Sequence, residues 1–237
     1  MAGGTTRKVT KRAAKTTAAS PRQRLVRDAD LARETILRVA REHFVSNGLA
    51  GARTDEIAAA SGYSKAMMYH YFGSKEALYL AVLEETYRRD ITPRRPVDIA
   101  EVGPVAALRS FVREGAEAVR KDPSILNLLS VENIHQGQYL RQTNLSDTSY
   151  LELKKRLQAI LDAGQQSGAF RAGIDVTQLY LLQASLIFHA ISNRFTLSII
   201  LGTDITSKTF MDRYIDAAID MVVGFCVNPL PSQQPER

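Results

Sequence analysis

The chain has 237 residues, enough for one large or two small domains, and its single cysteine, Cys226, excludes an intramolecular disulfide. Its 45% hydrophobic and 24% charged residues are ordinary for a globular protein and exclude a collagen-like or low-complexity chain. The formal net charge of +6 is unevenly placed, because residues 1–27 contain eight Lys and Arg side chains and no acid, which leaves −2 for the rest. Such a basic arm usually binds a polyanion, either nucleic acid or a membrane surface, although a merely solubilising tail is the alternative.

No targeting or membrane segment stands out. The N-terminus lacks the apolar stretch of a signal peptide. The longest apolar region, residues 176–201, contains polar side chains that a membrane span of this length would exclude, so we expect a buried helix there. We therefore expect a cytoplasmic protein, associated with the nucleoid if the arm binds DNA.

The hydrophobic periodicity predicts an all-α chain of about nine helices. Residues 1–24 show no such period and are expected to be a disordered arm. The first helix is expected from Leu31 to about Asn47, because Gly48 lies where a helix C-cap would. Three helices should then begin at Thr54, Ser64 and Ser74, each acting as an N-cap, with Gly62 and Gly73 between them. The remaining helices are expected at residues 104–121, 124–135, 150–166, 175–201 and 207–226.

The two short helices from Thr54 to Phe72 have the form of a helix-turn-helix, with a glycine-containing turn between them. Each is too short to be stable alone, so they should pack on the preceding helix through Ile57, Ala58, Met68 and Phe72. In such units the second helix enters the major groove and its N-terminal residues meet base edges. The candidate DNA-reading residues are Ser64, Lys65, Ala66 and Met67; the candidate phosphate-binding residues are Thr54, Tyr69, His70 and Tyr71.

Residues 31–78 resemble the DNA-binding domain of the TetR family of bacterial transcriptional regulators. The matching motifs are F-x-x-x-G (44–48), T-x-x-I-A (54–58), G-Y-S (62–64), Y-x-Y-F (69–72) and S-K-E-x-L (74–78), all at the family's spacing. The resemblance implies phosphate contacts at Thr54, Tyr69, Tyr71 and Lys75 and base contacts near residues 64–67. The chain departs from the family at Ala66, often Gly, and at Tyr71, often His, which affects the expected target sequence rather than the fold.

The resemblance also divides the chain. It implies a basic arm (1–24), a helix-turn-helix domain (25–73), a ligand-sensing and dimerisation domain (74–228) and a flexible tail (229–237). Family members usually pair their last two long helices in a four-helix bundle, and the apolar helices at about 175–201 and 207–226 exceed what one small domain can cover. We expect an effector pocket between the middle helices, with candidate contacts at His135, Tyr139, Gln183, His189 and Asn193.

The sequence therefore predicts a homodimeric repressor that a small-molecule inducer of unknown identity releases from a double-stranded DNA operator with an inverted repeat. An activator or dual regulator of the same fold is the alternative. An enzyme is disfavoured because the four histidines are scattered and no metal-ligand spacing, phosphate loop or nucleophile motif occurs; no cofactor is predicted. A membrane-surface protein is disfavoured because the arm lacks apolar residues at helical spacing.

Overall fold

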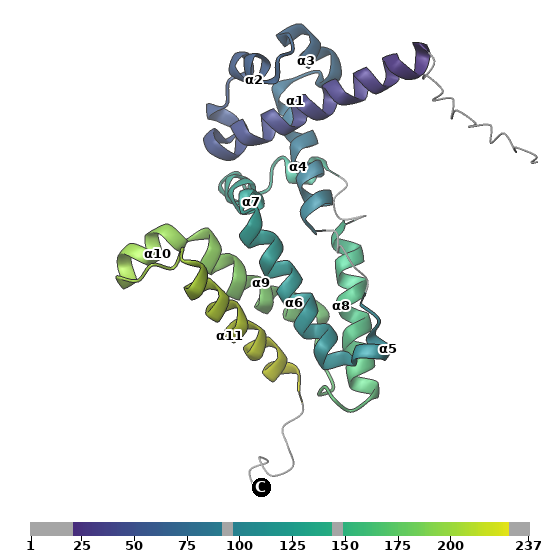
Figure 1. Cartoon of the computed structure of the whole chain (residues 1–237), viewed down its shortest axis with the longest axis vertical. Coiled ribbons are helices and arrows are strands. Elements are labelled where there is room, and N and C mark those ends of the chain that lie inside the picture. Colours follow the sequence, from purple (N-terminus) through teal and green to yellow (C-terminus); the bar gives the residue numbers. More distant parts are fainter. Residues whose placement is uncertain (1–20, 92–96, 144–148, 228–237) are drawn as a thin grey trace, which may run out of the picture.

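The computed structural model describes residues 21–91, 97–143 and 149–227. Within these ranges the chain is all-helical, with eleven α-helices and no strand apart from an isolated bridge between Phe170 and Val227. Figure 1 shows an elongated molecule with α1, α2 and α3 at one end and α11 running toward the other. The predicted all-α class is therefore confirmed. The predicted tail at 229–237 and most of the predicted arm lie outside the described residues.

The observed helices follow the expected order closely. The count exceeds about nine because one turn of helix forms at α5 and because the predicted helix at 175–201 is divided in two. The elements are α1 (Pro21–Gly51), α2 (Thr54–Ser61), α3 (Lys65–Phe72), α4 (Lys75–Ile91), α5 (Ile99–Val102), α6 (Pro104–Lys121), α7 (Ser124–Ile134), a 3₁₀ turn η1 (Leu140–Gln142), α8 (Ser149–Gln166), α9 (Val176–Ser192), α10 (Arg194–Leu201) and α11 (Lys208–Cys226).

The apolar side chains gather in two clusters. The first, called the head core, joins α1, α2, α3, the first half of α4 and Leu128 of α7. The second, called the body core, joins α6, α7, α8, α9 and α11. Since burial of apolar surface is the main favourable term in folding, these two clusters hold the two ends of the molecule. The large, fully buried side chains of the head core are Ile36, Phe44, Ile57, Met68, Leu78, Tyr79, Leu83 and Leu128.

The expectation of one buried helix over 175–201 is wrong. The chain bends by 74° between α9 and α10, and no residue of α10 is buried. The break lies at Asn193, whose side-chain amide donates to the carbonyl of His189 at 3.0 Å, while Arg194 donates to the carbonyl of Ile191 at 2.7 Å. The His189 carbonyl also accepts the Asn193 backbone amide at 3.1 Å, so the Asn193 side chain adds a second bond at the end of α9. The Arg194 side chain binds a carbonyl of the last turn of α9, and α10 leaves in a new direction (Figure 1).

Two local expectations at the N-terminal end also need correction. Helix α1 begins at Pro21 rather than Leu31, although it is interrupted at Gly48 (φ 65°) as expected. Thr54 is the first residue of α2 and not its N-cap; Arg53 holds that position, and its carbonyl accepts from the Ile57 amide at 3.1 Å. Phe72 packs against the head core as predicted; it is partly buried, with the Arg33 guanidinium of α1 5.3 Å from its ring centre.

Among the described residues, no single helix is both long and apolar enough to cross a membrane. Only α9 and α10 taken together pass that test by length and composition, and they are bent at Asn193.

Gly164 of α8 provides a test of the body core. A Cβ atom at this position would lie 1.9 Å from Cδ2 of Phe170, whose ring is 2% exposed. We expect Gly164→Ala to destabilise the chain by about 1–3 kcal/mol in urea unfolding, because the ring cannot move without disturbing the core. The matched control is Gly115→Ala on α6, where a Cβ meets nothing within 4 Å and should raise stability slightly. Equal stability of the two variants would contradict this packing.

Candidate nucleic-acid interface

Helix α3 is held by a capped start and a glycine stop. Gly62 adopts a left-handed conformation (φ 76°) at the end of α2 and lets the chain turn sharply. Ser64 is extended, and its hydroxyl accepts a hydrogen bond from the Met67 amide at 3.1 Å. Gly73 (φ 80°) ends α3, and Ser74 then caps α4 by accepting from the Ala77 amide at 3.0 Å. The predicted caps at Ser64 and Ser74 are confirmed.

The side chains of α3 divide between the head core and the surface. Met68 is 1% exposed and packs in the core with Ile57, whereas Met67 is 40% exposed. The helical periodicity of the sequence predicted that Met68 faces the core and Met67 faces outward, and this prediction is confirmed. The core contact therefore fixes which face of α3 is presented outward. Of the predicted DNA-binding residues, Ser64, Lys65, Ala66, Met67, Tyr69 and His70 are exposed, while Thr54, Tyr71 and Lys75 are partly buried.

Three predicted phosphate-binding residues make hydrogen bonds between neighbouring helices of the head. The Tyr69 hydroxyl donates to Oγ1 of Thr54 at 3.5 Å, which joins α3 to the first residue of α2. The Lys75 ammonium donates to the carbonyl of Ala50 at 3.4 Å, which joins the start of α4 to the end of α1. Hydroxyl, ammonium and backbone N–H donors at the starts of adjacent helices form a surface suited to phosphate oxygens.

An ion pair crosses the exposed side of the helix-turn-helix. Nζ of Lys65, the first residue of α3, lies 2.8 Å from Oδ1 of Asp55 on α2, and both side chains are well exposed. The hydrogen bond and charge of Asp55 raise the pKa of Lys65, and Lys65 in turn lowers the pKa of Asp55. The sequence predicted a base-reading role for Lys65, and this ion pair was not predicted. An acid ten positions earlier, on the preceding short helix, was the available signal.

The predicted effector contacts lie in two separate places. His135 and Tyr139 lie together after α7, with ring centres 6.2 Å apart, and Tyr139 also packs edge-on against Tyr79 of the head core. His189 and Asn193 lie together at the end of α9, where the amide of Asn193 is 3.3 Å from Nδ1 of His189. Gln183 is partly buried in the middle of α9. The pocket assignment itself stays a prediction.

A buried carboxylate next to His135 was missed. Glu132 of α7 is 2% exposed; it accepts from the Tyr79 hydroxyl at 3.0 Å and from the Leu140 amide at 2.9 Å. Burial and the neighbouring Glu132 raise the pKa of Tyr79. The signal in the sequence was that Glu132 is the one charged residue of α7. Because its oxygens are satisfied by α4 and η1, Glu132 ties these elements to α7.

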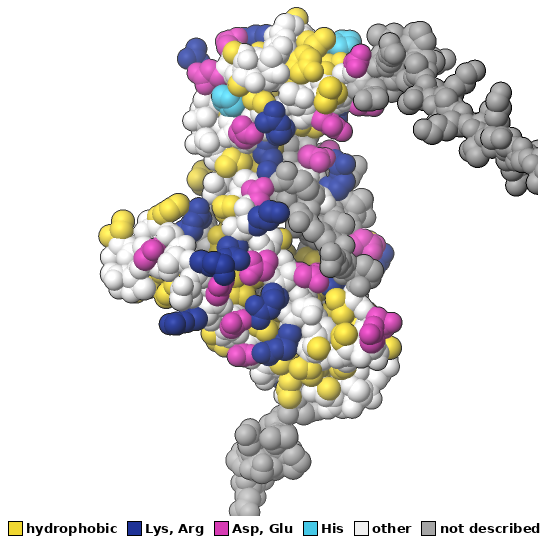
Figure 2. All heavy atoms as spheres, in the orientation of Figure 1, with side chains coloured by type: hydrophobic (Ala, Val, Ile, Leu, Met, Phe, Trp, Pro, Cys, Tyr) yellow, Lys and Arg dark blue, Asp and Glu magenta, His cyan; other side chains and the backbone are white. Residues whose placement is uncertain are grey.

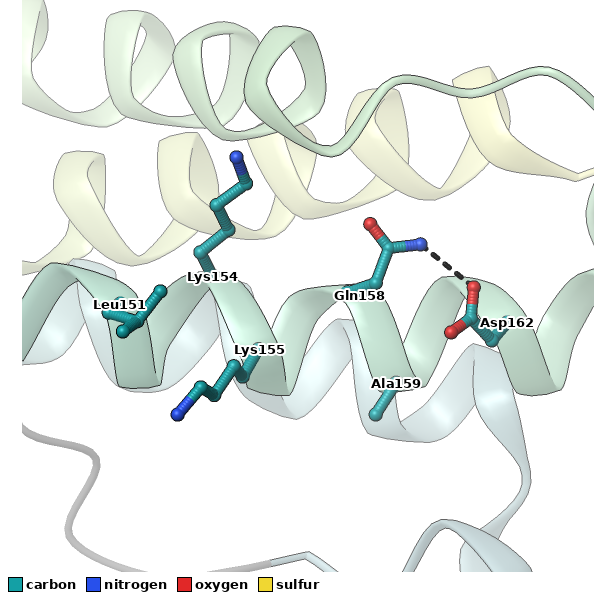
Figure 3. Close-up of a pocket in the computed structure, with 6 residues that line it drawn as sticks. All are labelled: Leu151, Lys154, Lys155, Gln158, Ala159 and Asp162. Carbon is teal, nitrogen blue, oxygen red and sulfur yellow. Dashed lines mark hydrogen bonds between the residues drawn. The ribbon is translucent and has the colours of Figure 1, made fainter.

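One surface hollow lies on the outer side of α8 (Figure 3). It is lined by Leu151, Lys154, Lys155, Gln158, Ala159 and Asp162, all from this single helix, and includes none of the predicted effector contacts. Gln158 donates to Asp162 at 2.8 Å across it. Among the described residues, no group of three or more His, Cys, Asp or Glu side chains could hold a metal ion.

The C-terminal helices leave large apolar side chains in solvent. Helix α10 projects sideways from the body (Figure 1), and hydrophobic side chains appear on its surface (Figure 2). Met221 of α11 is 63% exposed, although Ile219 and Val222 beside it are buried. We call this set the distal apolar surface: Leu181, Leu182, Phe195, Ile199, Ile200, Leu201, Met221 and Phe225.

Comparison with family models agrees with this arrangement. Residues 36–82 match the model described as "Bacterial regulatory proteins, tetR family". Residues 104–222 match "Tetracyclin repressor-like, C-terminal domain". The two matches cover the helix-turn-helix and most of the body.

Individual relatives point the same way. The chain is 35% identical over 182 residues to the HTH-type transcriptional repressor NicS of Pseudomonas putida, covering 76% of this chain and 85% of NicS. It is 26% identical over 184 residues to the transcriptional regulator RutR of Escherichia coli, covering 78% and 85%. The crystal structure of the putative regulator SCO4942 from Streptomyces coelicolor has the same fold, with a TM-score of 0.60, 22% identity and coverage of 84% and 99%. The chain belongs to the TetR family of bacterial transcriptional regulators.

Proposed function

We propose that this chain is a homodimeric repressor that works in the cytoplasm and that a small-molecule effector releases from an inverted-repeat operator. The observation that carries the proposal is the outward face of α3, which is capped at Ser64, anchored at Met68 and bordered by phosphate-type donors. A short, firmly held helix of this kind fits the major groove and presents its N-terminal residues to base edges. The name of NicS, a repressor, supports the direction of regulation.

On DNA, the residues of the outward face take different roles. Lys65 can donate to guanine O6 or N7, and Met67 can contact a thymine methyl group. Ser64 and Ala66 lie beside them, where the backbone approaches the groove. Phosphates would be bound by Thr54, Tyr69, His70, Tyr71 and Lys75, and the basic arm at residues 1–24 would add further phosphate contacts.

The distal apolar surface supports dimerisation. Ile199 and Ile200 are 82% and 75% exposed, and single monomers rarely leave so many large apolar side chains close together in water. Pairing of the helices at about 175–201 and 207–226 with those of a second copy would cover them. The partly exposed Arg113–Asp216 pair (2.6 Å) joins α6 to the opposite side of α11 and would hold that helix in place.

The effector would shift the protein from its DNA-binding conformation to one that does not bind the operator. It would bind among the middle helices, near candidates such as Tyr139 or Gln183. The loss of DNA affinity is limited by how much more tightly the effector binds the second conformation than the first. No enzymatic reaction, cofactor or metal is part of this proposed mechanism.

The direct test is selection of bound duplexes from a random DNA pool. Wild type should enrich an inverted repeat with half-sites roughly 34–36 Å apart, or a small multiple of this. The Tyr69→Ala/Lys75→Ala protein should lose the enrichment, because two of the donors on the phosphate-facing border are removed. Salt-sensitive retention of DNA with no enriched motif would contradict the proposal and indicate non-specific binding.

Removal of Asp55, the acid paired with Lys65, tests the role of Lys65 in DNA binding. Asp55→Asn should raise affinity for random duplex by about two- to fivefold, because it frees Lys65 and removes a negative charge facing phosphates. Operator affinity should rise less, so the ratio of specific to non-specific affinity falls. The matched control is Glu56→Gln, which removes one acid from the same turn of α2. Glu56 is paired with Arg53 and not with Lys65, so this variant leaves the Lys65 pair intact. If the two variants behave alike in equilibrium DNA titrations, the pair does not affect DNA recognition.

A charge on the distal apolar surface tests dimerisation. Met221→Glu should weaken the dimer by about tenfold or more, because an ionised carboxylate would enter an apolar interface. The dimer Kd is measured by analytical ultracentrifugation. Leu151→Glu places the same charge on the exposed side of α8, at a side chain that is 40% exposed, and should leave the Kd unchanged. A monomeric wild type, or equal effects of both variants, would contradict the proposed interface.

A further inference from the structure

Helix α7 lies between the two cores. Ile125 and Leu126, in its first turn, belong to the body core, while Leu128 belongs to the head core. Val131 lies 3.8 Å from where a Cβ of Gly48 would be, so α7 also faces the kink of α1. The orientation of the helix-turn-helix relative to the body therefore depends on how α1 and α4 sit against α7 and its corner with α6.

Apolar contacts at this junction stabilise the packing, but the hydrophobic effect is itself non-directional. Directional restraint at this junction comes from hydrogen bonds. One restraint is Glu132, which binds Tyr79 of α4. The other involves Arg41 of α1.

Arg41 joins three elements at once. Its Nε donates to the Thr86 hydroxyl of α4 at 3.1 Å, and its Nη1 donates to Oδ2 of Asp122 at 2.9 Å. The Arg41 side chain is only 15% exposed, and Thr86 is fully buried. The guanidinium is planar, and its N–H groups point in fixed directions. The two bonds therefore restrain both the distance and the angle between α1 and the corner where α6 meets α7.

Asp122 is itself held in place. It caps the C-terminus of α6, and its Oδ1 accepts from both the amide and the hydroxyl of Ser124 at the start of α7. Although its partial burial acts in the opposite direction, the hydrogen bonds from Ser124 and Arg41 lower the pKa of Asp122 to about 2. The carboxylate is therefore ionised and oriented at neutral pH, and Arg41 meets a fixed acceptor rather than a mobile one.

This angle matters for a dimer on DNA. Adding one base pair between two half-sites moves the second site by roughly 3.4 Å and rotates it by roughly 35°. A dimer can reject such a shifted site only if each helix-turn-helix is held at a defined angle to the body. A loosened junction would let α3 follow the shifted groove.

We propose that Arg41 and Asp122 are positioning residues that set the half-site spacing which the protein accepts. The inference rests on the proposed function, since spacing has meaning only for a dimer on an inverted repeat. Neither residue needs to touch DNA. The residues of α3 determine which bases are preferred within a half-site. The contacts of Arg41 and Asp122 determine which spacer length between half-sites is accepted.

The test measures binding to the selected operator and to versions with the central spacer changed by one and two base pairs. The variants are Arg41→Gln and Asp122→Asn. Their controls are Arg38→Gln and Glu42→Gln, which remove the same groups from an exposed ion pair within α1 (3.1 Å). We expect the affinity ratio between the best and the shifted spacers to fall about fivefold or more in the two variants, with half-site base preference unchanged. The controls should keep the wild-type ratio.

Each outcome is decisive. An unchanged spacer ratio in Asp122→Asn, with a lower melting temperature, would make the link purely structural and overturn the proposal. If Arg41→Gln fails to fold, Asp122→Asn carries the test, because it leaves the Arg41–Thr86 bond in place; Asp122→Glu should restore part of the ratio. If wild type enriches no inverted repeat, the proposed function fails first and the spacing role falls with it.

Discussion

The DNA-facing surface depends on a small core beneath it. Helices α2 and α3 have eight residues each, and helices of this length are unstable alone in water. Ile57 and Met68 anchor them on α1 and α4, where Phe44 and Tyr79 pack edge to face at 5.1 Å. This anchoring decides which face of α3 is buried. The identity of the exposed residues, and so the chemistry presented to DNA, follows from it.

The other end of the molecule is built differently. Helix α11 packs one side on the body core and leaves Met221 and Phe225 exposed, and α10 buries none of its residues. A single chain thus has polar donors at one end and exposed apolar side chains toward the other. The proposed dimer uses both, since it covers the apolar end and directs two copies of α3 to the same side of a duplex. The junction at Arg41 would then transmit the geometry of one end to the other.

Local signals were sufficient for much of the fold. Glycines and serines at 62, 64, 73 and 74 placed α3 and the start of α4, and prolines bounded α6 correctly at Pro104–Lys121. Helical phase assigned Met68 to the core. Membership of the TetR family followed from motifs whose spacing depends on these same turns. These features depend on neighbours within a few residues, which a sequence displays directly.

The predictions that failed, and the contacts that were missed, involve side chains. Their partners lie far away in the sequence, or the side chains themselves bind backbone carbonyls. The chain bends at Asn193, where the side chains of Asn193 and Arg194 bind carbonyls of the last turn of α9, although the apolar composition favoured one continuous helix. The Arg41–Asp122 pair joins residues 81 positions apart, and no periodicity indicates it. Glu132 binds Tyr79, which lies 53 positions earlier on another helix, and helical periodicity does not indicate that contact. The effector contacts were chosen as polar residues on apolar helices, a pattern that cannot show which of them share one pocket.

The most direct test of the central claim is amide hydrogen exchange of the whole chain with and without a selected operator duplex. If α3 reads the groove, operator binding should slow exchange at the start of α3 and in the first turn of α2. The exposed side of α8 around Gln158 should exchange as in the free protein. Protection confined to residues 1–24, with α3 unchanged, would contradict the account, because DNA would then be held by the basic arm alone.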